Sequence, residues 1–204
     1  MNGEFWRKHW YKLTMGIVSA VLLVAIAFVY LGGSEPDFPV EGPAADFELT
    51  DIQGETVSMQ NTSGKVRLLY FFFANCPDVC PPTTHMLSRV QERLQEEGVF
   101  GTEATILQIT VDPERDTPEV LRQYAANFNA DLDAWRFLRG TEAEIAAIGE
   151  DYNMLIRKDE STGLYIHSNV VYMIDGDNQI RKRFVADDLN DELIANDVMA
   201  LLNE

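Results

Sequence analysis

The chain has 204 residues, with 33 Asp and Glu against 16 Lys and Arg, so its formal net charge at pH 7 is −17. This length suits one globular domain plus an appendage. An acidic excess of this size argues against nucleic acid or an anionic lipid surface as a partner, because both would repel it. It is compatible with cations and with basic protein surfaces.

The first candidate element is an uncharged apolar segment over residues 14–31. Its length is close to the minimum for a helix that crosses a bilayer. Three basic residues and one acidic residue precede it, whereas only acidic residues follow it closely. By the positive-inside rule, residues 1–13 lie in the cytoplasm and the remaining domain lies outside.

We therefore predict a single transmembrane helix over 14–31, a Pro-rich acidic linker over 32–43 and a globular domain over 44–204. A cleaved signal peptide is the alternative, since residues 25–27 read Ala-Ile-Ala. The apolar run continues through residues 28–31, which favours a retained anchor. The short N-terminus without a transit-like presequence favours a bacterial plasma membrane, with the C-terminal domain extracytoplasmic.

Strands and helices alternate along the globular part. A hairpin over 46–59 comes first, and a second hairpin near the end precedes a final amphipathic helix over 189–203. Between them the hydrophobic pattern predicts buried strands and helices in turn, with strands over 66–73, 104–111 and 135–140, helices over 82–97, 116–128 and 141–154, and late hairpin strands over 169–175 and 179–185.

This order predicts an α/β domain with a mainly parallel central sheet and helices on both faces. The first hairpin is then an N-terminal extension. A βαβ unit that carries a cysteine pair at its strand-to-helix junction is typical of a thioredoxin-like fold. We therefore predict a thioredoxin-like central sheet with this β-hairpin extension, preceded by one transmembrane helix.

Both cysteines of the chain, Cys76 and Cys80, lie in the stretch "FFFANCPDVCPPTTHM". Thiols at a helix N-terminus are expected to have lowered pKa values. An i, i+4 spacing on a helix separates the Cα atoms by roughly 6 Å, which a disulfide can bridge. A purely structural disulfide is disfavoured, because so short a loop adds little stability. A redox-active pair and a metal-binding pair both remain open.

A third metal ligand would come from His9, His85 or His167. His9 lies in the predicted cytoplasmic segment, and His85 lies on the helix after the cysteines. His167 precedes a buried strand whose entry loop packs beside the cysteine loop in a thioredoxin-like fold, so it is the best candidate. Two thiolates and one imidazole suit Cu(I) or Cu(II), whereas structural zinc prefers four protein ligands.

Three motifs, in this order and spacing, resemble the Sco/SenC family of membrane-anchored, thioredoxin-like copper proteins. They are "CPDVCP" after an aromatic strand, "VDPERDTPE" over 111–119 and "HSNVVYMID" over 167–175. The likeness extends over about residues 44–202, and the single N-terminal anchor also fits the family.

The resemblance implies a redox-active protein that binds copper through Cys76, Cys80 and His167. It implies a metallochaperone that assists assembly of the dinuclear copper centre of cytochrome c oxidase subunit II, by delivering copper, by reducing that subunit's cysteines, or both. A copper donor or a thiol reductant would be a further partner. Asp112 and Asp116 receive no ligand role, because capping of the following helix explains their segment.

Two alternatives to a metallochaperone remain. In a thiol–disulfide oxidoreductase without copper, Cys76 would attack and Cys80 would resolve. A peroxidase or redox sensor of the peroxiredoxin kind ranks third, because no suitable hydroxyl and cation setting surrounds the cysteines.

Overall fold

The computed structural model describes residues 10, 12, 14–24, 38–185 and 188–204. The chain divides into two compact units, Met1–Asp37 and Phe38–Glu204. In the first unit, residues 14–24 are helical. Within the described ranges, none of the helices has both the length and the apolar character needed to cross a membrane. Residues 25–31 of the predicted transmembrane segment lie outside the described residues.

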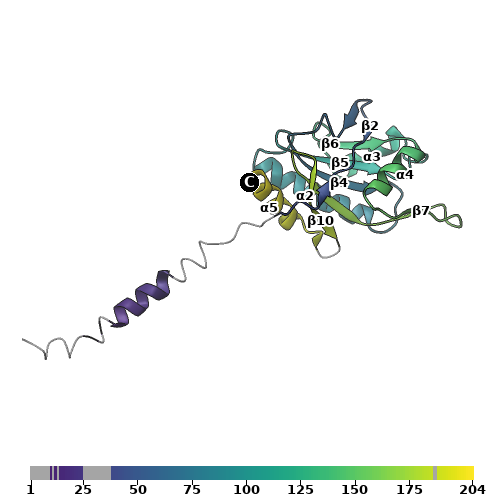
Figure 1. Cartoon of the computed structure of the whole chain (residues 1–204). Helices are drawn as coiled ribbons and strands as arrows, with labels where there is room; N and C mark the ends of the chain where they lie inside the picture. The colour runs from purple at the N-terminus through teal and green to yellow at the C-terminus, as the bar shows by residue number, and fades with distance from the viewer. Residues whose placement is uncertain (1–9, 11, 13, 25–37, 186–187) are drawn as a thin grey trace, which may run out of the picture. The chain divides into compact units, whose positions relative to one another are not determined.

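The second unit is built on an eight-stranded sheet with strand order β1-β10-β9-β4-β5-β6-β2-β3 (Figure 1). The bounds of its strands are β1 Gly42–Pro43, β2 Glu48–Asp51, β3 Thr56–Ser58, β4 Val66–Phe72, β5 Ala104–Thr110, β6 Trp135–Arg139, β9 Val170–Ile174 and β10 Gln179–Val185. A separate two-stranded sheet joins β7, Ile156–Lys158, to β8, Tyr165–His167.

Strands β4 and β5 at the centre of the sheet are covered on both faces. All seven residues of each strand are buried, as expected for parallel strands under helices on both sides. β5 pairs in parallel with β4 and with β6, whereas β9 and β10 run antiparallel. The α/β domain with its terminal antiparallel hairpin is confirmed. The predicted mainly parallel sheet is wrong, because among the described strands only the pairings of β5 with β4 and β6 are parallel, and the hairpins β2–β3 and β9–β10 add antiparallel strands on both sides.

Four helices pack on this sheet, namely α2 Cys80–Glu96, α3 Pro118–Asn127, α4 Glu142–Asp151 and α5 Asp191–Leu202. Consecutive β4 side chains show that both faces are covered. Phe72 contacts Tyr124 of α3, whereas Phe71 contacts Tyr152 at the end of α4, and neighbouring strand residues point to opposite faces. The predicted capping by Thr117 is confirmed, since its side chain accepts a hydrogen bond from the Val120 amide.

Two features differ from the sequence-based expectation. Phe38 is buried and Gly42–Pro43 pairs with β10, so the compact unit includes part of the predicted linker over 32–43. The β7–β8 hairpin was not predicted and extends from the body of the domain (Figure 1). Its two strands have only three residues each, so they are too short to carry a periodic signal.

Candidate metal centre

The two cysteines flank the turn between β4 and α2. Cys80 is the first residue of α2, and prolines follow it in the first turn, where a missing amide proton costs no helical hydrogen bond. Both thiols are unbridged. Cys80 is 0% exposed and Cys76 is 9% exposed. The local sequence thus places one thiol within the core and the other at its edge.

His167 ends β8 and faces Cys80. Its Nε2 lies 3.5 Å from the Cys80 Sγ, and its Nδ1 lies 3.0 Å from the Ser168 carbonyl oxygen. A carbonyl oxygen only accepts hydrogen bonds, so Nδ1 carries the proton and donates it there. The neutral ring therefore presents the Nε2 lone pair to the thiol. This is the form in which imidazole binds a metal, with its other nitrogen bonded to the protein.

Burial controls the protonation of both groups. Burial, together with the adjacent Cys76 thiol, raises the pKa of Cys80. The predicted lowering of the Cys80 pKa by the helix N-terminus is therefore wrong, because desolvation of the thiolate outweighs its favourable interaction with the helix dipole. Burial likewise lowers the pKa of His167, which keeps the imidazole neutral. A metal ion that replaces the thiol proton would remove the cost of burying an uncompensated thiolate.

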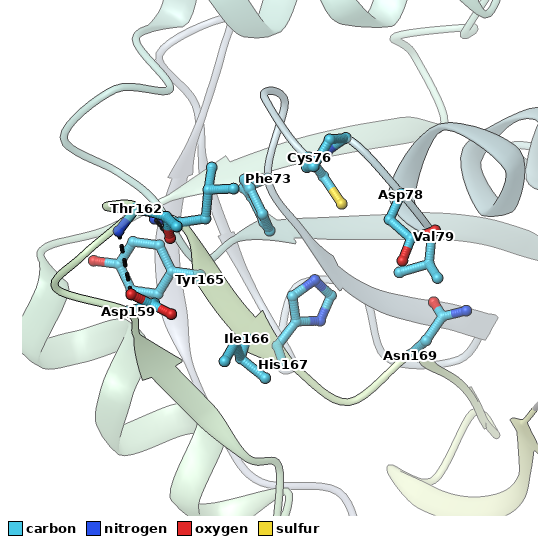
Figure 2. Close-up of a pocket in the computed structure, with 12 residues that line it drawn as sticks. Phe73, Cys76, Asp78, Val79, Asp159, Thr162, Tyr165, Ile166, His167 and Asn169 are labelled. Atoms are coloured by element: carbon cyan, nitrogen blue, oxygen red, sulfur yellow. Dashed lines mark hydrogen bonds between the residues drawn. The ribbon is translucent and has the colours of Figure 1, made fainter.

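A pocket of about 390 Å³ opens beside the cysteine loop, and Cys76 and His167 both line it. Figure 2 shows the Cys76 sulfur and the His167 ring directed into the space between the loop and the hairpin. Asp78 lines the pocket as well, and apolar walls come from Phe73 and Ile166. Cys80 does not line it, so an incoming group meets Cys76 and His167 first.

Cys80 and His167 are thus brought together, but Cys76, the remaining predicted ligand, does not form a closed site with them. In the part of the chain that the structure describes, no cluster of three or more His, Cys, Asp or Glu side chains is compact enough to hold a metal ion. His85 is exposed on α2, and His9 lies outside the described residues. A three-ligand site therefore requires Cys76, Cys80 and His167 to come closer together than they do in this structure.

Asp116 supports the cysteine loop, which the sequence did not reveal. Its buried Oδ2 accepts a hydrogen bond from the Ala74 amide at 3.0 Å and another from the Thr110 hydroxyl. Asp112 is also buried and forms an ion pair with Arg115. Neither Asp112 nor Asp116 is among the residues that line the cysteine–histidine pocket.

Asn169 is a second residue that supports the site and that the sequence did not reveal. Its side chain contacts Tyr70 of β4 and Thr83 of α2. The only local signal for it was its spacing, since residues 167 and 169 share a face in an extended segment.

A paired cysteine loop at a strand-to-helix junction, facing a histidine from a late strand, defines a thioredoxin-like domain with a soft-metal or thiol-redox site. The SCO1/SenC family model matches residues 40–203. The chain therefore belongs to the SCO1/SenC family.

Known relatives are similar to this chain over most of its length. A SCO1 protein homolog of Bacillus subtilis is 29% identical over 168 residues, covering 80% of this chain and 86% of the relative. The structure of Arabidopsis thaliana ScoI with copper bound matches with a TM-score of 0.67 at 28% identity, covering 79% of this chain and 99% of that one.

The structure of BsSco, described as a member of the Sco family of cytochrome c oxidase assembly proteins with a disulfide switch, matches with a TM-score of 0.69 at 26% identity. It covers 81% of this chain and 98% of that one. These likenesses confirm the predicted thioredoxin-like architecture.

Proposed function

We propose that this protein is a copper metallochaperone with thiol redox activity, which binds copper as cargo through Cys76, Cys80 and His167. The observation that carries the proposal is the unprotonated Nε2 of His167, 3.5 Å from the Cys80 sulfur. Two thiolates and an imidazole form a donor set that copper prefers. Membership of a family with copper-bound structures supports the same ion.

Loading follows from the different exposure of the two thiols. Copper entering the pocket meets Cys76 and His167 first, and Cys80, which already lies beside His167, binds it as the thiol proton is released. Because Cys76 lies on a loop and not within a helix, it is the ligand whose movement can close the site. The same accessible thiol would be the first to pass copper to an acceptor.

The physiological acceptor in this proposal is the dinuclear copper centre of cytochrome c oxidase subunit II, with a copper donor or thiol reductant supplying the protein. A domain anchored by residues 14–31 and facing outward from a bacterial plasma membrane would meet that subunit. The uncharged segment and its flanking charges support the anchor. Deletion of residues 1–33 should move the protein from the membrane fraction to the soluble fraction, and unchanged membrane association would contradict the anchor.

The copper site is tested by titrating the reduced full chain with Cu(II) and recording absorption. We expect a one-to-one complex with an intense thiolate-to-copper band in the wild type. His167→Ala should lose or reshape this band, and Cys76→Ser and Cys80→Ser should each abolish tight binding. His85→Ala is the matched control and should behave as wild type. An unchanged spectrum in His167→Ala would remove the three-ligand model.

A thiol–disulfide oxidoreductase without copper is the second candidate, because Cys76 is accessible in the pocket and Cys80 is buried. The Cys76 thiolate would attack a partner disulfide and release one partner thiol. Cys80 would then attack the Cys76 sulfur and release the second thiol, leaving a Cys76–Cys80 disulfide in the chain and a reduced partner. Oxidation to this disulfide with no retained copper in the titration would favour this candidate.

A further inference from the structure

His167 is not held by the main sheet. It is the last residue of β8, and β8 pairs only with β7 in the separate two-stranded sheet. The main sheet resumes at Val170, the first residue of β9. Only Ser168 and Asn169 connect the two. The His167 ring also packs edge-on against Phe73. The backbone that carries His167 to within 3.5 Å of Cys80 is held from the main-sheet side through this short connection.

Asn169 fixes it at two points. Its Oδ1 accepts a hydrogen bond from the Tyr70 hydroxyl at 3.0 Å, and its carboxamide lies 3.3 Å from the Thr83 hydroxyl. Tyr70 belongs to the centre of β4 and is 0% exposed, and Thr83 is 5% exposed. Both contacts thus join the connection to elements that are locked into the core.

We call these hydrogen bonds of Asn169 to Tyr70 and Thr83 the brace. Thr83 links the brace to the metal centre, because Thr83 lies three residues after Cys80 on α2. Residues three apart on a helix share a face. The residue two positions after His167 is therefore tied to the helix face that carries Cys80. The brace acts across 86 positions of sequence between Thr83 and Asn169.

We propose that Asn169 is the positioning residue that holds His167 against Cys80, so that these two side chains form a preorganised half-site which Cys76 completes when copper arrives. The proposal rests on the proposed function, since it assigns the origin of the His167 geometry in the copper site. It assigns Asn169 no direct contact with the metal.

The test compares copper binding by the full chain and its Asn169→Ala variant. Loss of an outer support typically weakens metal binding about 10- to 100-fold. We expect Asn169→Ala to weaken Cu(II) binding by about tenfold and to shift or weaken the His167-dependent absorption band.

Two further variants keep the test decisive if Asn169→Ala folds poorly. Tyr70→Phe and Thr83→Val each remove one hydroxyl and keep a side chain of nearly the same shape. Thr83→Val is the cleaner of the two, because the Tyr70 hydroxyl also interacts with the Cys80 thiol. Each should shift the band in the same direction by a smaller amount. Asn61→Ala is the matched control, since the Asn61 carboxamide is likewise held by hydrogen bonds, in its case to backbone groups, but lies in the turn after β3. It should lower the unfolding temperature without altering the copper spectrum.

The outcomes separate the two proposals. Equal copper affinity and an identical spectrum in wild type and Asn169→Ala would overturn the positioning role and leave the copper site standing. A wild-type protein whose copper complex does not depend on His167 would overturn both. A weakened, reshaped complex in Asn169→Ala with a normal complex in Asn61→Ala would support the brace.

Discussion

Asp116→Ala tests how strongly the core holds the cysteine loop. The Asp116 carboxylate is 1% exposed and accepts hydrogen bonds from the Ala74 amide and the Thr110 hydroxyl. Ala74 lies two residues before Cys76, so this contact fixes the start of the loop. Removing the carboxylate leaves both donors without this acceptor.

The size of the destabilisation follows from the two hydrogen-bond donors, the Ala74 amide and the Thr110 hydroxyl, that lose their acceptor. A buried group left without a partner costs about 1–3 kcal/mol. Part of that cost is offset, because the variant no longer buries a charge and the second oxygen, Oδ1, has no hydrogen-bond partner. We expect a net loss of about 2–3 kcal/mol in the free energy of unfolding. For a domain of this size, that corresponds to a fall in Tm of roughly 4–12 °C.

Asp116→Asn separates the hydrogen bonds from the charge. Its amide oxygen can accept from both donors, so the variant should lose less than about 1 kcal/mol at neutral pH. Burial raises the pKa of Asp116 above its ordinary 3.8. Below that value both the folded and unfolded carboxyls are protonated. As pH rises, the Asp116 carboxyl of the unfolded chain ionises first. The contribution of Asp116 to stability is therefore lost as pH rises through the pKa of the folded carboxyl.

The assay is thermal unfolding of wild type, Asp116→Asn and Asp116→Ala, followed by circular dichroism at several pH values. The stability of Asp116→Asn relative to wild type should rise with pH, because only the wild type titrates at this position. If Asp116→Asn were as unstable as Asp116→Ala at neutral pH, the charge itself, and not the accepted hydrogen bonds, would support the loop.

Three further predictions concern the fold and the metal centre. In denaturant titration, Leu87→Ala should lower the free energy of unfolding by about 2–5 kcal/mol, because this α2 side chain is 0% exposed. Leu155→Ala, at an exposed position, should change the free energy of unfolding by less than about 0.5 kcal/mol. Equal effects of the two substitutions would contradict the assigned core. Asp191→Asn should cost about 0.5 kcal/mol, since Arg93 lowers the pKa of Asp191. That contribution is present above the ordinary carboxyl pKa and is lost as pH falls through the folded pKa, so a difference from wild type that persisted at low pH would refute it. In isothermal titration with copper, His85→Ala should match wild type, because His85 is exposed on α2, and weaker binding would show a ligand role there.

Much of the fold is predictable because its signals are local. The apolar run of β4, which only Arg67 interrupts, identifies a central strand, and Thr117 followed by Pro118 identifies the start of α3. The resemblance carried by three motifs also identified His167 as the partner of the cysteines. Such features depend on neighbours in sequence or on a known order of elements, so they survive without coordinates.

The supports of the site depend on pairings that sequence alone does not display. Asp116 reaches Ala74 across 42 positions, and Asn169 reaches Tyr70 across 99. Either residue alone looks like an ordinary polar side chain at the end of a strand or the start of a helix. The protonation of Cys80 was mispredicted for a related reason, since a helix N-terminus is visible in sequence but the depth of burial is not.

The central claim is that Cys76, Cys80 and His167 together hold copper. X-ray absorption spectroscopy at the copper edge, on the copper-loaded full chain, counts the neighbours of the ion directly. We expect two sulfur neighbours and one imidazole nitrogen, with the nitrogen lost in His167→Ala. A copper ion with no imidazole nitrogen in the wild type, or with fewer than two sulfurs, would contradict it.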